Sequence, residues 1–144
     1  MLKNEQLLVF LQFVCFLVLW YLNGFYSQNY ILFAIQIIAL LIGVWSLFEL
    51  GRGKISIFPS VKKGTVLIKT GPFKLVRHPI YLSLLLYFNS FLLDELSIFS
   101  LMFNILLLTV IISKIELEES LLKDYFESYA QYQKHTYKLI PYIY

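Results

Sequence analysis

Residues 7–26 read LLVFLQFVCFLVLWYLNGFY, a stretch of 20 residues without a charged side chain. A helix of this length rises about 30 Å, which matches the hydrocarbon thickness of a bilayer. Two similar uncharged runs follow at residues 30–48 and 96–112. These runs predict an all-α integral membrane protein.

A shorter apolar run at residues 80–93 predicts one further membrane helix. Its 14 residues rise about 21 Å, which is less than a full crossing of about 30 Å. Only Asp94 and Glu95 separate it from the run at 96–112, so we expect these two helices to form a tight hairpin with its turn at the far interface. The chain is therefore expected to form a single membrane domain over residues 1–144, with about four transmembrane helices.

The composition excludes a soluble or disordered protein. Hydrophobic residues make up 59% of the chain and charged residues 15%, against roughly 45–50% and 25% in soluble domains. A chain with 13 Phe and 11 Tyr also has ample apolar surface to bury. We interpret the first run as a retained anchor, because it is longer than a signal-peptide core and no small-x-small cleavage site follows it.

Positive charges collect between the second and third apolar runs. Residues 51–78 contain seven Lys and Arg side chains and no acidic one, whereas residues 23–29 carry no charge. The positive-inside rule therefore predicts that this basic loop is cytoplasmic, and an even number of helices places both termini on the same side. Within the loop, β-branched side chains flanked by turn residues at 64–72 suggest a short strand or β-hairpin at the membrane surface.

After residue 114 the pattern becomes amphipathic, which predicts a cytoplasmic helix over residues 115–134. On a helical wheel Glu118 falls near the middle of the apolar face and Glu119 falls at its edge. A carboxylate on an apolar face is costly unless a cation or a hydrogen-bond donor meets it. Glu118 is therefore expected either to pair with a basic residue of the 51–78 loop or to face a ligand pocket.

The tripeptide Arg77-His78-Pro79 stands where the basic loop enters the membrane helix at 80–93. Proline suits the first turn of a helix, so His78 is placed at the cap and Tyr81 one turn further in. Cationic side chains beside free helix N–H groups favour an anionic ligand. A capped helix start with a snorkelling Arg77 would explain the same residues without a ligand.

Two other classes of site find little support. The histidines His78 and His135 show no metal-ligand spacing, so no metal site is predicted. Anionic lipid headgroups account for the basic loop as well as nucleic acid would, so no nucleic-acid partner is predicted.

The sequence TGPFKLVRHPIY at 70–81, followed by EESLL at 118–122, Tyr129, Tyr132 and Ile140-Pro141, resembles the isoprenylcysteine carboxyl methyltransferase and phospholipid methyltransferase superfamily. The resemblance covers residues 67–143. Similar proteins are integral membrane enzymes that bind S-adenosylmethionine between the R-H-P element and the E-E helix. The resemblance implies six cofactor-binding residues and identifies no catalytic one: Arg77, His78, Pro79, Tyr81, Glu118 and Glu119.

Two positions depart from the superfamily pattern. Ser83 stands where a glycine is usual. The segment Phe126-Glu127-Ser128-Tyr129 is one residue shorter than its counterpart and lacks the glycine, which affects the expected turn and the path of the last helix.

The resemblance implies S-adenosylmethionine-dependent methyl transfer to a lipidic or prenylated acceptor, such as an isoprenylcysteine carboxylate. The expected partners are the lipid bilayer and this lipophilic small molecule. Two alternatives stay open: an NADPH-dependent membrane reductase of the sterol-reductase type, whose terminal region is similar, and a non-catalytic membrane scaffold. The residues leave the choice among carboxylate, amine and thiol acceptors open, and they do not fix the oligomeric state.

Overall fold

The structure is a computed structural model that describes residues 2–51 and 66–144. The described residues form helices and no strand. In chain order the elements are α1 (Leu2–Asn23), α2 (Tyr30–Gly51), the 3-10 helix η1 (Gly71–Lys74), α3 (Pro79–Asp94), α4 (Ile98–Tyr125) and α5 (Tyr129–Lys134). Residues 52–65 of the basic loop lie outside the described part of the chain.

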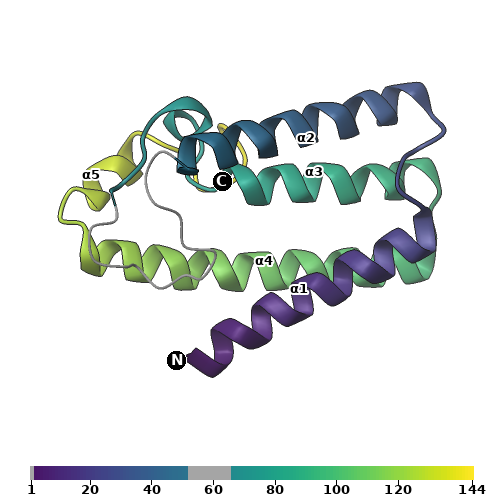
Figure 1. Cartoon of the computed structure of the whole chain (residues 1–144), viewed down its shortest axis with the longest axis horizontal. Coiled ribbons are helices and arrows are strands. Elements are labelled where there is room, and N and C mark those ends of the chain that lie inside the picture. The colour runs from purple at the N-terminus through teal and green to yellow at the C-terminus, as the bar shows by residue number, and fades with distance from the viewer. Residues whose placement is uncertain (1, 52–65) are drawn as a thin grey trace.

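The four long helices run antiparallel in chain order (Figure 1). α2 packs along α3, α1 packs along α4, and contacts between α3 and α4 join the two pairs. The turns from α1 to α2 and from α3 to α4 lie at one end of the bundle, whereas both chain termini and α5 lie at the other (Figure 1). We call this second end the α5 end.

Three helices are long and apolar enough to cross a membrane: α1, over Glu5–Asn23, α2 and α4. The prediction of an integral membrane protein with three long apolar helices is therefore confirmed. α3 has 16 residues, which corresponds to about 24 Å. Its full crossing stays a prediction, as does the cytoplasmic position of the basic loop and both termini.

A buried apolar core joins α1, α3 and α4. The rings of Phe16 and Phe88 stack with their centroids 4.9 Å apart, and Leu107 and Ile111 of α4 are fully buried beside them. Many large apolar side chains on the outer faces of α1, α2 and α4 are exposed. Such an extensive apolar exterior is expected for a bundle surrounded by lipid.

Polar residues bring α2 and α3 together. A Cβ added at Gly43 of α2 would lie 2.8 Å from Ser83 Oγ of α3, so the two helices approach too closely for a side chain at that position. Ser83, which replaces the usual glycine, is thus accommodated by a glycine on the facing helix. Gln36 Nε2 also donates to Ser90 Oγ at 2.8 Å. Small residues and interhelical hydrogen bonds are the usual means of helix association in lipid.

α4 continues through the position where the sequence pattern separates a membrane helix at 96–112 from an amphipathic helix at 115–134. No Pro or Gly occurs within Ile98–Tyr125, so a change of polarity does not interrupt the helix backbone. The amphipathic part is instead the end of α4, followed by the separate short helix α5. With 28 residues, α4 is about 42 Å long, so its last turns extend beyond a hydrocarbon core of about 30 Å.

The strand expected within residues 64–72 is not found in its described part, residues 66–72. A lone strand would leave its backbone groups unpaired. Residues 66–69 are irregular, and η1 begins at Gly71, where φ is 56° and a Cβ would lie 2.8 Å from Glu49 Cγ. Both features favour glycine. Gly64 and Thr65 lie outside the described residues.

Candidate functional site

The end of the chain holds the segment that precedes α3. Arg77 N donates to Tyr137 O at 2.8 Å, His78 N donates to Lys138 O at 3.2 Å, and Tyr137 N donates to Leu75 O at 3.0 Å. An isolated parallel β-bridge links the same two segments. The backbone carrying Arg77 and His78 is therefore fixed on both sides, by α3 and by the C-terminal segment.

Pro79 starts α3, as the sequence predicts. It occupies the first turn, where its missing N–H has no cost, and His78 is the N-cap residue. The His78 side chain makes no capping hydrogen bond to the helix. Its imidazole contacts α4 instead.

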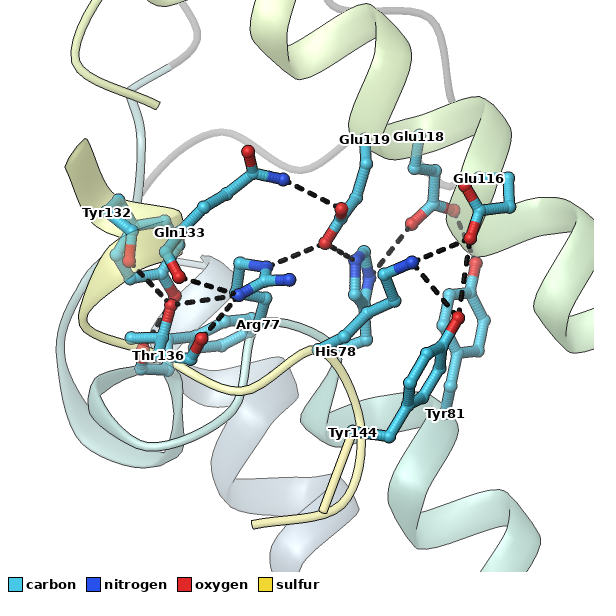
Figure 2. Close-up of polar contacts among 12 residues, drawn as sticks. Arg77, His78, Tyr81, Glu116, Glu118, Glu119, Tyr132, Gln133, Thr136 and Tyr144 are labelled. Atoms are coloured by element: carbon cyan, nitrogen blue, oxygen red, sulfur yellow. Dashed lines mark hydrogen bonds and ion pairs between the residues drawn. The ribbon is translucent and has the colours of Figure 1, made fainter. Parts of the chain in front are cut away.

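Glu119 of α4 is enclosed by Arg77. Arg77 Nε lies 2.6 Å from Glu119 Oε1, and the two side chains are 8% and 5% exposed. Gln133 Nε2 donates to Glu119 Oε2 at 2.8 Å, and Arg77 also donates to the carbonyl oxygens of Gln133 and Thr136 (Figure 2). A buried ion pair is tolerated when its remaining donors and acceptors are also satisfied, as they are here.

Glu118 is the more accessible of the two glutamates. Tyr81 donates its hydroxyl to Glu118 Oε1, and His78 Nδ1 lies 3.5 Å from Glu118 Oε2. The Glu118 side chain is 21% exposed, against 5% for Glu119. This order is the reverse of the one read from the helical wheel. The wheel considers one helix alone, whereas Arg77 and Gln133 approach Glu119 from other segments and cover it.

His78 lies between the two carboxylates. Its Nε2 is 3.3 Å from Glu119 Oε1 and its Nδ1 is 3.5 Å from Glu118 Oε2, and the residue is buried. Burial alone would lower the pKa of His78, but the hydrogen bonds and charges of both glutamates outweigh burial and raise the pKa above its ordinary 6.5. A protonated ring can then donate from both nitrogens to the two carboxylates.

One polar network contains most of the residues selected from the sequence. Pro79 contributes through the backbone only, by starting α3. Figure 2 shows the side chains that the structure brings together: Arg77, His78, Tyr81, Glu118 and Glu119. Sequence reasoning missed Gln133 and Thr136. Thr136 receives Arg77 chiefly through its carbonyl oxygen, and a backbone contact of this kind leaves no signal in the side-chain pattern.

The shortened segment after α4 forms a tight turn. Phe126 N donates to Leu122 O at the end of α4, and Tyr129 N donates to Phe126 O where α5 begins, both at 2.9 Å. Tyr129 is 1% exposed, and Tyr132 donates its hydroxyl to Phe73 O at 2.6 Å. The turn therefore brings α5 against η1 without the glycine of the superfamily pattern. Burial raises the pKa of Tyr132 to about 12, so this phenol is neutral near pH 7.

An apolar cavity of about 340 Å³ lies beside α3, between α2 and α4. Its lining extends from Ile140, close to the segment that holds His78, to Leu93 near the other end of α3. Leu82, Leu86 and Leu108 line the space between them. Its size and its apolar lining suit a hydrocarbon chain.

A family model described as phospholipid methyltransferase matches residues 26–129, well over half of the chain. The matched region includes α2, α3 and α4, and with them the R-H-P element and both glutamates of the network. No curated protein matches the chain.

Proposed function

Because the chain belongs to the phospholipid methyltransferase family of integral membrane methyltransferases, we propose that it transfers a methyl group from S-adenosylmethionine to a lipidic or prenylated acceptor. The single observation that carries this proposal is the network at the α5 end. There Arg77 and His78, which precede α3, contact the paired carboxylates Glu118 and Glu119 of α4.

The chemistry of this network fits the proposed cofactor. Glu118 keeps an exposed edge, and a carboxylate there can accept hydrogen bonds from ribose hydroxyls or from the methionyl ammonium. The first N–H groups of α3 have no side-chain cap, so with His78 beside them they can receive the methionyl carboxylate. When bound, the cofactor supplies an electrophilic methyl group on a sulfonium.

We assign different tasks to the network residues. Glu118 and Tyr81 face the cofactor, and the Pro79 turn presents the N–H groups of α3 to it. Arg77 and Glu119 are enclosed by one another and by the C-terminal segment, so they fix the wall of the site. His78 joins the two parts because it touches both carboxylates.

The reaction itself asks mainly for positioning. In a methyl displacement, the nucleophile must lie in line and about 3–3.5 Å from the methyl carbon, and correct placement alone can supply several kcal/mol of the barrier. The apolar cavity beside α3 offers a place for the acceptor's hydrocarbon chain. Its end at Ile140 lies two residues from Lys138, whose carbonyl accepts the His78 backbone N–H.

The acceptor that we propose arrives ionised, as a carboxylate such as that of isoprenylcysteine would. Within the network that the structure describes, His78 is the side chain that titrates nearest neutral pH, and both its nitrogens face carboxylates. It therefore has no lone pair directed at an acceptor. A thiolate or phenolate acceptor would meet the same requirement, whereas an ammonium would first have to lose a proton.

Ligand-dependent thermal unfolding of the full chain in detergent tests the proposal. A ligand that binds the folded state raises the melting temperature by mass action. We expect S-adenosylmethionine and S-adenosylhomocysteine to stabilise the protein and NADPH to have no effect. The Glu118→Gln variant should lose this response, whereas Glu127→Gln, at an exposed position beyond α4, should keep it.

Two results would decide for the alternatives. Stabilisation by NADPH alone would favour the reductase. A well-folded protein that responds to none of the three ligands would favour the non-catalytic scaffold, in which Tyr81 and His78 would serve as permanent partners of Glu118.

A further inference from the structure

Lys114 is a buried cation of α4, one helical turn before Glu118. It is only 5% exposed. Its Nζ donates to Gln12 Oε1 of α1 at 2.6 Å and lies 5.2 Å from the centre of the Tyr81 ring. Both partners are neutral, so they satisfy and shield the ammonium without balancing its charge.

The chain provides no anion in contact with Lys114. The ion pairs of the network are Arg77 with Glu119, His78 with both glutamates, and Lys138 with Glu116, and no described carboxylate forms one with Lys114. Residues 1–4 and 52–65, whose side chains are outside the described part of the structure, contain no Asp or Glu. A counter-ion for Lys114 must therefore come from another molecule.

The charges around the network leave Lys114 in surplus. Arg77 balances Glu119, and the His78 imidazolium balances Glu118. A desolvated ammonium without an anion is costly, and an ionisable side chain kept inside a membrane protein marks a ligand site by default. Gln12 holds Nζ by accepting one of its three N–H groups, so the ammonium keeps further donors for a ligand.

We propose that Lys114, positioned by Gln12, binds an anionic group of the acceptor lipid, either a phosphate or a carboxylate. This inference rests on the proposed methyl transfer and names its acceptor as an acidic lipid. Lys114 and Glu118 are four residues apart on one face of α4, with Lys114 about 6 Å nearer to the middle of the bundle. A headgroup that arrives from the bilayer would thus meet Lys114 on the membrane side of the proposed cofactor site.

Three probes with one chain and different headgroups test the inference: dodecyl phosphate, dodecanoate and uncharged dodecanol. Their effect on thermal unfolding is measured on the full chain in an uncharged detergent. We expect an anionic probe to stabilise the wild type more than dodecanol does. A stronger response to dodecyl phosphate would identify a phosphate headgroup, and a stronger response to dodecanoate would identify a carboxylate.

Substitutions then assign the effect to one residue. Lys114→Met should weaken binding of the preferred anionic probe at least tenfold, while Lys114→Arg, which keeps the charge, should retain most of it. Lys123→Met is the matched control, because Lys123 lies on the same helix and is exposed. Melting without ligand shows whether each variant is folded. Gln12→Leu should give a smaller loss than Lys114→Met.

The same variants separate this inference from the proposed function. Lys114→Met should bind S-adenosylmethionine as the wild type does. An unchanged response of Lys114→Met to both anionic probes, or an equal response of the wild type to dodecanol, would overturn the inference. Loss of S-adenosylmethionine binding with full retention of probe binding would also overturn it. If the wild type binds the anionic probe through Lys114 but does not bind S-adenosylmethionine, the anion site stands and the proposed methyl transfer fails.

Discussion

Arg77 Nε lies 2.6 Å from Glu119 Oε1, with both side chains almost completely buried. The same guanidinium donates to the carbonyl oxygens of Gln133 and Thr136, so one side chain ties the start of α3 to the end of α4 and to the C-terminal segment. Glu118, the neighbouring residue, contacts Tyr81 and His78 and keeps an exposed edge. The two adjacent glutamates therefore differ in what they should do.

Replacing Glu119 should mainly destabilise the protein. Glu119→Gln leaves the buried Arg77 guanidinium without a counter-charge, and removing one partner of a buried ion pair costs on the order of 3 kcal/mol. The measurement is the melting temperature in detergent without ligand. Glu116→Gln is the control, since the Glu116 side chain is 58% exposed in its pair with Lys138, and exposed pairs contribute only about 0–1 kcal/mol. Equal melting temperatures for Glu119→Gln and wild type would refute a structural role for the Arg77 pair.

Replacing Glu118 should mainly weaken cofactor binding. Glu118→Gln keeps an oxygen for Tyr81 but loses the charge offered to the cofactor, which should lower affinity by about 1.5–3 kcal/mol, or roughly 10- to 150-fold. Calorimetric titration with S-adenosylhomocysteine measures this loss. On folded protein the loss should exceed that of Glu119→Gln, as the sequence analysis also expects, although the reason is now exposure rather than position on the wheel. The opposite order would contradict the assignment of Glu118 as the cofactor-facing carboxylate.

The stability contributed by His78 should fall as the pH rises. The pKa of His78 is raised in the folded protein, so its contribution is complete below its ordinary pKa of about 6.5 and is lost as the pH passes through the raised value. We therefore expect the difference in melting temperature between wild type and His78→Asn to shrink from about pH 6 to about pH 9. A difference that stays constant or grows over this range would mean that the folded protein does not hold His78 as a cation.

The basic loop should face the cytoplasm. Lys74 is exposed on η1, and Gln28 is exposed in the turn between α1 and α2, near the opposite end of the bundle. In a Cys15→Ala background, a membrane-impermeant maleimide added to intact cells should label Gln28→Cys and spare Lys74→Cys until the cells are opened. Labelling of Lys74→Cys in intact cells would reverse the predicted orientation.

The membrane helices were within reach of sequence reasoning, but their ends were not. The uncharged run at 30–48 identified α2, yet the helix continues to Gly51 through Glu49. A charge does not end a helix when its side chain finds a partner, and Thr70 donates to Glu49 Oε2 at 2.5 Å. For the same reason the polar residues after Lys114 did not divide α4. Polarity predicts where lipid ends, whereas only backbone breakers predict where a helix ends.

The candidate site could be located from sequence, while its division of labour could not. Local signals placed His78 and Pro79 at a helix start, and the resemblance placed the two glutamates opposite them. The cover over Glu119 comes from Gln133 and Thr136, in a segment that reaches the site only through the turn after α4. Exposure at such a position depends on tertiary packing, which the periodicity of one helix does not contain.

The last prediction concerns how the acceptor loses its proton. Because both ring nitrogens of His78 lie against carboxylates, at 3.3 and 3.5 Å, the imidazolium is a donor on both sides and has no free lone pair with which to act as a base. Activity should then follow ionisation of the acceptor rather than of the enzyme. We expect N-acetyl-S-farnesylcysteine, a carboxylate, to be methylated in preference to the amine of phosphatidylethanolamine. At saturating S-adenosylmethionine, the pH–rate profiles of wild type and His78→Asn should have the same shape, with a lower plateau in the variant. A limb near neutral pH that is present in wild type and disappears in His78→Asn, at unchanged cofactor affinity, would identify His78 as the general base and would favour an amine acceptor.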